Sequence, residues 1–117
     1  MAESAIRDGS FTMALNEFLD EFYREQCART RYEMLAVRPP EIDPAKDAYL
    51  AAVAEHFSYH LGLGPAPEWV HEPTRFLDKP WFADSGVEGL RPLLIKESPL
   101  AFRRRWLFVS GNALSRA

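Results

Sequence analysis

Apolar side chains recur at helical spacing near the start of the chain. From Ser10 onward, large apolar residues lie three or four positions apart with polar residues between them, at Phe11, Leu15, Phe18, Leu19 and Phe22. Ser10 is the expected N-cap, because its hydroxyl can accept a hydrogen bond from a first-turn amide. The pattern predicts an amphipathic helix, preceded by a flexible leader of small and polar residues over 1–9.

A weaker helical pattern follows over Arg29–Val37, with apolar positions at Tyr32, Leu35 and Ala36. Pro39-Pro40 must stop this helix, because proline lacks the amide proton and its ring clashes with the preceding turn. The sequence therefore predicts a second, short helix before the double proline.

The strongest helical signal begins at Asp43-Pro44. Asp43 is a good N-cap, and Pro44 would occupy the first helical position, where its missing amide costs nothing. An apolar stripe follows at Tyr49, Leu50, Val53, Ala54, Phe57 and Leu61. Gly62 or Gly64 is expected to end this helix, which we expect to form the centre of the core.

Prolines divide the second half of the chain into short segments, at Pro65, Pro67, Pro73, Pro80, Pro92 and Pro99. Val87–Lys96 can form one short helix that turns Leu90, Leu93 and Leu94 inward, and Ser98-Pro99 repeats the cap-and-proline signal before another. Trp106–Val109 has strand-like composition but is too short to imply a sheet. The predicted fold is mostly α: a single small helical domain over 10–117, with a proline- and aromatic-rich irregular C-terminal half.

Composition sets the class of protein. The chain has 117 residues, of which 47% are hydrophobic, and this suffices for one core. It contains no apolar run of membrane-spanning length, and its first residues lack the pattern of a secretory signal. Its single cysteine, Cys27, cannot form an internal disulfide and suits a reducing compartment. We therefore expect a cytoplasmic protein that does not contact a membrane.

Charge is unevenly distributed along the chain. The formal net charge is -3, but residues 1–64 hold 6 Lys and Arg against 11 Asp and Glu, whereas residues 65–117 hold 8 against 6. The acidic balance argues against a protein whose whole surface binds nucleic acid. This balance does not exclude a local basic site for nucleic acid near the C-terminus.

Candidate catalytic and metal-binding groups are few. His56 and His60 lie four residues apart and share a helix face, yet no third metal ligand is evident, and the order differs from His-Glu-x-x-His. Cys27 has no histidine nearby in the sequence and is more simply a buried thiol. Acidic residues occupy surface-like helical positions, and no phosphate-binding glycine loop occurs. We expect that the protein is not an enzyme and binds neither a cofactor nor a metal. A metal-dependent enzyme is the weakest alternative.

Aromatic and arginine residues are concentrated in the second half, and both types anchor protein interfaces. The candidate partner-binding residues are Trp69, Trp81, Phe82, Phe102, Arg103, Arg104, Arg105 and Trp106. Most of the aromatic rings should belong to the core. The arginines can equally bind phosphates of a nucleic acid, or bind carboxylates and carbonyls within the domain. Binding to a protein partner is the leading hypothesis, and a small nucleic-acid-binding regulator is the alternative.

Much of the second half also resembles the C-terminal signature of a family of small uncharacterised bacterial proteins. The segments that carry the resemblance are Pro67–Val70, Phe76–Phe82, Leu90-Arg91, Glu97–Arg105 and Leu107–Arg116. Phe18–Tyr23 and the helix from Asp43 fit the N-terminal half of the same family, so the resemblance covers most of the chain.

Relatives of this kind occur beside genes for nucleotidyltransferase-type toxins of the AbiEii class. The resemblance therefore implies an antitoxin-like or accessory protein that binds such a toxin, and it brings no catalytic residues. Neutralisation of this kind needs only a surface that covers the active site of the toxin, and an acidic N-terminal half could cover a basic nucleotide pocket.

Overall fold

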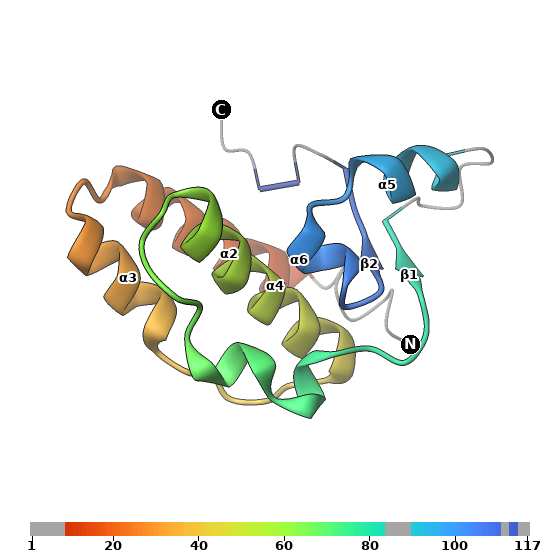
Figure 1. The fold of residues 1–117 in the computed structure, drawn as a ribbon, viewed down its shortest axis with the longest axis horizontal. Helices are drawn as coiled ribbons and strands as arrows, with labels where there is room; N and C mark the ends of the chain where they lie inside the picture. Colours follow the sequence, from red (N-terminus) through yellow and green to blue (C-terminus); the bar gives the residue numbers. More distant parts are fainter. Residues whose placement is uncertain (1–8, 84–89, 111–112, 115–117) are drawn as a thin grey trace.

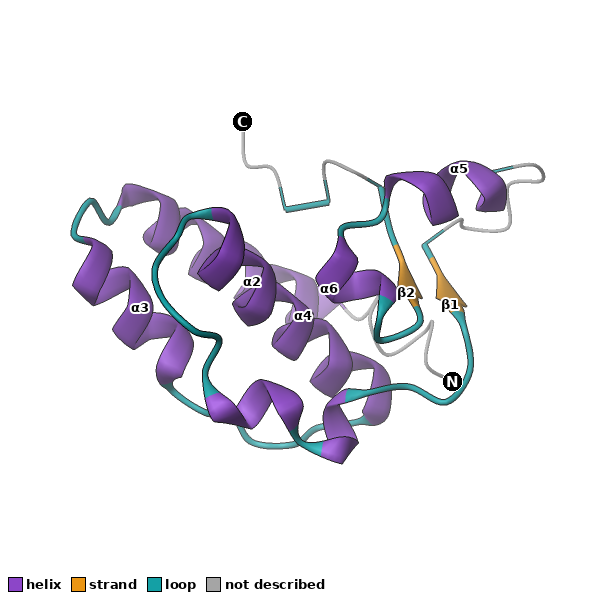
Figure 2. Ribbon diagram, in the orientation of Figure 1, coloured by secondary structure: helices purple, strands orange, loops and turns teal. Residues whose placement is uncertain are grey.

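The computed structural model describes residues 9–83, 90–110 and 113–114, and its architecture is mostly helical (Figures 1 and 2). The elements are α2 (Gly9–Arg24), α3 (Ala28–Ala36), α4 (Pro44–His60), the 3-10 turns η1 (Glu68–His71) and η2 (Pro73–Arg75), β1 (Trp81–Phe82), α5 (Arg91–Glu97), α6 (Leu100–Arg103) and β2 (Leu107–Phe108). This confirms the mostly α fold class. Residues 1–8 of the expected leader lie outside the described residues, as do residues 87–89 of the expected helix over 87–96.

Helix α4 lies between the other two long helices and the C-terminal elements (Figure 1). Its predicted start is confirmed, because the Asp43 carboxylate accepts a hydrogen bond from the Lys46 amide at 3.0 Å and Pro44 begins the helix. Its predicted end is confirmed as well. Gly62 has a φ of 62°, in the left-handed region that glycine tolerates best, and the Leu63 amide closes the turn onto the Ser58 carbonyl at 3.0 Å.

Burial of α4 extends over more of its surface than the predicted stripe. Helix α4 contacts α3, η1, η2 and α6, so it has partners on several sides. Alanines between the large side chains are buried and let these partners approach closely, at Ala45, Ala48, Ala51, Ala52 and Ala54. Leu61 was expected in the stripe but lies beyond the end of the helix and is 37% exposed. The centre of the core is nevertheless at α4, as predicted.

Two carboxylates of α4 are buried, which corrects the expectation that the acidic residues lie on surface positions. Asp47 and Glu55 each lie beside a fully buried arginine. The Arg75 guanidinium has Nη1 3.8 Å from Asp47 Oδ1 and donates from Nη2 to the Pro39 carbonyl at 2.9 Å. This contact joins the segment before α4 to η2.

The second buried pair joins α4 to the C-terminal half. Arg105 has Nη2 2.9 Å from Glu55 Oε1, while its hydrogen bonds go to the carbonyls of Ala101 at 2.9 Å and Val70 at 2.8 Å. Arg104 donates to the other Glu55 oxygen at 3.0 Å. Burial lowers the pKa of Arg105, and the Glu55 carboxylate opposes that shift. The arginine run therefore binds groups within its own domain.

A small parallel sheet corrects the view that Trp106–Val109 is too short to imply one. Trp81 pairs with Leu107, and Phe82 pairs with Phe108. The Trp81 amide donates to the Trp106 carbonyl at 2.8 Å, and the Ala83 amide donates to the Phe108 carbonyl at 3.0 Å. Parallel strands need a long crossover connection, which here includes α5 and α6.

Three local expectations are wrong. Helix α2 already includes Ser10, so Ser10 is not its N-cap. Leu93 was expected to face inward but is 47% exposed, and Leu94 is the buried leucine of α5. Ser98 does not cap α6; its hydroxyl accepts from the Val109 amide at 2.8 Å and joins α5 to the segment after β2.

Replacing Glu55 with alanine should strongly destabilise the fold. The substitution leaves the buried Arg105 charge without its carboxylate, and loss of one partner from a buried ion pair costs about 3–5 kcal/mol. Urea unfolding followed by circular dichroism measures this loss. The matched control is Glu33→Ala, which breaks an exposed pair with Arg29 and should change stability little. Equal effects of the two substitutions would contradict a structural role for the Glu55–Arg105 pair.

The burial of the Tyr49 phenol should make the folded protein less stable at high pH. Burial raises the pKa of its phenol to about 12, from an ordinary value of 10.0. Between these values the unfolded chain releases the proton and the folded chain keeps it, so stability falls as pH rises, by about 1.4 kcal/mol per pH unit. Urea unfolding at several pH values measures the slope. Tyr49→Phe should remove this part of the decline, and an unchanged slope in that variant would contradict the assignment.

Candidate functional site

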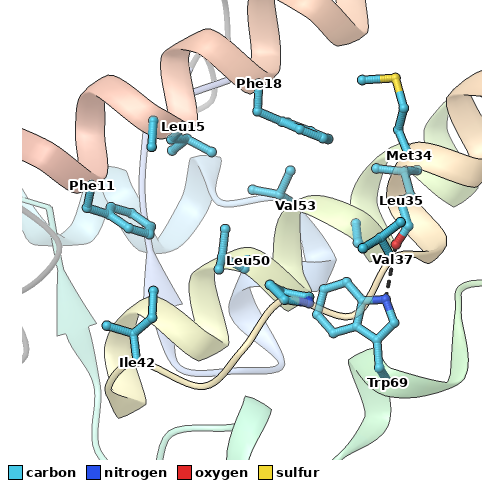
Figure 3. Close-up of a pocket in the computed structure, with 13 residues that line it drawn as sticks. Phe11, Leu15, Phe18, Met34, Leu35, Val37, Ile42, Leu50, Val53 and Trp69 are labelled. Carbon is cyan, nitrogen blue, oxygen red and sulfur yellow. Dashed lines mark hydrogen bonds between the residues drawn. The ribbon is translucent and has the colours of Figure 1, made fainter.

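An apolar pocket of about 370 Å³ opens between α2, α3 and α4 (Figure 3). Its lining comes from four segments of the chain and consists of Phe11, Ala14, Leu15, Phe18, Met34, Leu35, Val37, Pro39, Ile42, Leu50, Val53, Ala54 and Trp69. No charged side chain is among these residues. Pockets of this size and character typically bind ligands or side chains that are largely apolar.

The walls of the pocket follow from helix periodicity. Phe11, Leu15 and Phe18 lie on one face of α2, and Figure 3 shows them opposite Leu50 and Val53 of α4. These α2 residues were predicted to be the buried stripe of the helix, but all three are only partly buried. The stripe packs against the core on one side and borders the pocket on the other.

The floor of the pocket is fixed by a tryptophan. Trp69 of η1 lies against the end of α3, and its indole Nε1 donates to the Leu35 carbonyl at 3.0 Å, drawn as a dashed line in Figure 3. This bond satisfies the polar atom of the ring, so the ring presents only apolar surface to the pocket. The guanidinium carbon of Arg75 lies over the Trp69 ring, 4.9 Å from the ring centroid.

The lip of the pocket is formed by the segment between α3 and α4. Val37 and Ile42 are exposed there, at 71% and 56%. Arg38 binds Glu72 through Nε at 3.0 Å, and the Ile42 amide donates to Asp47 Oδ1 at 2.7 Å. The segment that forms the lip is therefore held near its start by Arg38 and at its end by the Ile42 amide, while Val37 and Ile42 stay exposed.

Sequence reasoning missed this pocket, although Trp69 was among the predicted binding residues. Val37 ends the predicted helix over Arg29–Val37 outside its apolar positions, and Ile42 follows the double proline with no periodic neighbour, so the pattern did not mark either residue as part of a site. Their position could have indicated a site. Large aliphatic residues on either side of a double proline have no amphipathic helix that would bury them, so they are candidates for an apolar surface.

Half of the predicted partner-binding residues are internal. Those that the structure buries are Trp69, Trp81, Phe102 and Arg105. Burial of Trp69 and Trp81 agrees with the expectation that most of the aromatic rings belong to the core. The rings belong to the core because α4 and the two-stranded sheet supply enough neighbours to bury them, and Arg105 is drawn inward by Glu55.

The other four candidates retain surface area but also make internal contacts. Arg103 donates from Nε to the Ser98 carbonyl at 2.8 Å, and Arg104 donates to Glu55. Phe82 is stacked on Phe108, with ring centroids 4.9 Å apart. These residues lie around the turn from α6 into β2, away from the apolar pocket.

Trp106 occupies an unusual backbone conformation at that turn. Its φ is 64°, and for a bulky residue the left-handed region costs roughly 1–2 kcal/mol. Its side chain is 49% exposed and makes an edge contact with the Phe108 ring at 6.5 Å. The conformation allows the Trp106 amide to donate to the Arg103 carbonyl at 3.0 Å and close the end of α6.

The remaining reactive groups are arranged as follows. His56 and His60 stack with ring centroids 5.1 Å apart, and burial together with the neighbouring His60 lowers the pKa of His56. Cys27 is exposed at the start of α3, which corrects its expected burial. Backbone and side-chain contacts from Thr30 lower the pKa of its thiol. Among the described residues, no three His, Cys, Asp or Glu side chains are grouped closely enough to hold a metal ion.

In the part of the chain that the structure describes, every helix is too short or too polar to cross a lipid bilayer. Comparison of the chain with protein-family models, curated proteins and solved structures found no match in any of the three. The functional interpretation therefore depends on the geometry of the site.

Two substitutions at Trp106 distinguish the cost of its left-handed backbone from the contribution of its ring to packing. Trp106→Gly removes the ring and relieves the left-handed strain, whereas Trp106→Ala removes the ring and keeps the strain. The glycine variant should therefore be more stable than the alanine variant by about 1 kcal/mol. Urea unfolding of both variants measures the difference. An alanine variant as stable as the glycine variant would show that the chain does not hold this conformation in solution.

Proposed function

We propose that this chain is a cytoplasmic, non-catalytic protein that binds another protein through the pocket between α2, α3 and α4. The observation that carries the proposal is an open pocket lined only by apolar residues, with Val37 and Ile42 exposed at its lip. Covering apolar surface is favourable by about 25 cal/mol per Å². A partner that inserts large aliphatic or aromatic side chains here would remove this surface from water.

The charge of α2 favours a basic partner segment. The exposed acidic residues Glu17, Asp20 and Glu21 of α2 outnumber the single basic residue of that helix, Arg24, whereas α3 carries two arginines and one glutamate. Complementary charge steers association and selects among partners that share the same apolar anchors. The expected ligand is therefore a segment with two or three apolar side chains flanked by lysine or arginine.

The resemblance to proteins encoded beside AbiEii-class toxins supports a more specific form of the proposal. In this form, the chain is the antitoxin of a toxin–antitoxin pair and neutralises a nucleotidyltransferase-type toxin by covering its active site. The acidic character of the helical half is compatible with a basic nucleotide pocket on the toxin. No catalytic group on this chain is needed for such an activity.

A nucleic-acid-binding function has less support from the geometry. Arg105 is buried, and Arg103 and Arg104 already donate to acceptors within the domain. At most two guanidinium groups of the run therefore reach the surface, and affinity for nucleic acid depends mainly on the number of contacts with phosphates.

Substitutions at the lip test the proposed pocket. Val37→Lys and Ile42→Lys place a charge at the edge of the apolar surface and should weaken binding to the protein encoded by the adjacent gene by at least about tenfold. Both side chains are exposed, so the fold should be unaffected. Isothermal titration calorimetry measures the affinity, and size-exclusion chromatography verifies the complex.

The matched control is Met13→Lys, which changes a residue of α2 that is 65% exposed and does not line the pocket. This variant should bind as the original chain does. Equal weakening by all three substitutions would show a nonspecific charge effect, and separate elution of the two proteins at micromolar concentration would contradict the antitoxin form of the proposal.

A further inference from the structure

A second hollow, of about 420 Å³, lies between the C-terminal part of α4 and α6. It is lined by Glu55, His56, Tyr59, His60, Leu100, Ala101 and Arg104. None of these residues lines the apolar pocket, so this site is independent of the proposed function. Its character also differs, because nitrogen-containing side chains from two elements face one space.

The lining of this hollow carries one carboxylate and one guanidinium, and a second guanidinium, that of Arg105, lies directly beside the carboxylate, so the group as a whole is positive when both histidines are neutral. Glu55 is the acidic residue among the described lining residues, and it lies within 3.0 Å of both guanidinium groups. Arg105 is fully buried behind the hollow and balances the Glu55 charge from inside the domain. The charge of Arg104, whose side chain is 40% exposed, is therefore the one that faces the hollow.

Arg104 has donors beyond those used within the domain. A guanidinium carries five N–H groups in a planar fork, and the structure gives one hydrogen bond from Arg104, to Glu55. The group is held in place by that bond and by the Phe76 ring, whose centroid lies 5.5 Å from the guanidinium carbon. A fork fixed in this way is suited to binding an oxyanion.

The two histidines supply the other wall. Their spacing of four residues places the rings nearly parallel, at 13°, with centroids 5.1 Å apart. Protonation of both would place two positive charges side by side, and the proximity of His60 already contributes to the lowered pKa of His56. A bound anion would offset that repulsion and favour the protonated rings, which each donate two hydrogen bonds.

We infer that this hollow binds a small phosphate ester, with Arg104, His56 and His60 contacting the phosphate oxygens. A phosphate ester offers three terminal oxygens to three donor groups, whereas a carboxylate offers two. Tyr59 and Leu100 are 64% and 73% exposed at the same hollow and provide apolar surface for the body of the ligand. The volume is within the range of known small-molecule sites.

Titration of the full chain with phenyl phosphate, followed by calorimetry, tests the site, and phenol serves as the uncharged comparison. Phenyl phosphate should bind and phenol should not. Arg104→Ala should weaken binding by about tenfold, as expected for the loss of a charge-assisted contact. Arg103→Ala is the matched control, because it removes the same charge from the neighbouring residue, which does not line the hollow.

The control should bind phenyl phosphate with an affinity within about twofold of the original chain. Equal weakening by Arg103→Ala would show only diffuse attraction to a basic region and would overturn the proposal. Absence of any binding at concentrations up to about 10 mM would overturn it as well, because even weak specific sites are occupied there.

A second measurement keeps the test decisive even if Arg104→Ala unfolds. Phenyl sulfate keeps a constant charge between pH 5 and 8, and nuclear magnetic resonance follows the imidazoles of the original chain. The ligand should raise the pKa of His56, and it should move the imidazole resonances of His60 and leave those of His71, on η1, in place. His60→Gln should weaken binding, with His71→Gln as its control. An unchanged pKa of His56 together with unmoved His60 resonances would contradict the site and would not affect the proposal of a protein complex.

Discussion

The buried contact between Glu55 and Arg105 determines how the two halves of this molecule fit together. Helix α4 contributes the carboxylate, and the turn after α6 contributes the guanidinium, which also donates to the carbonyls of Ala101 and Val70. A charge buried without its partner is strongly unfavourable, so α6 and the η1 turn must stay close to α4. This constraint positions the hollow between α4 and α6, and it holds η1, whose Trp69 lines the apolar pocket, against α4.

Helix α4 is shared by the two sites. Leu50 and Val53 line the apolar pocket, whereas His56 and His60, nearer its C-terminal end, line the basic hollow. The two lining sets have no residue in common, so the sites differ in chemistry on one rigid support. Under the two proposals taken together, one macromolecule and one small anion bind without competition between them. Neither proposal requires bond-making chemistry.

The fold was largely predictable because its signals are local. The cap at Asp43, the proline at Pro44 and the left-handed glycine at Gly62 act within a few residues, and each is found where the sequence placed it. The two-stranded sheet was not predictable, because it joins Trp81 to Leu107 across a connection that carries no strand period. The candidate site was missed for the same reason, since its lining comes from four separate segments. Burial of Arg105 depended on the Glu55 carboxylate, about fifty residues away, which no local pattern reveals.

We propose that a protein partner covers the pocket between α2, α3 and α4. Hydrogen–deuterium exchange of the chain, alone and with the protein encoded by the adjacent gene, tests this proposal. We expect slower exchange in the complex over the segment from Val37 to Ile42 and along α2, with α5 unchanged. Protection confined to the turn around Trp106, or no protection at all, would contradict it.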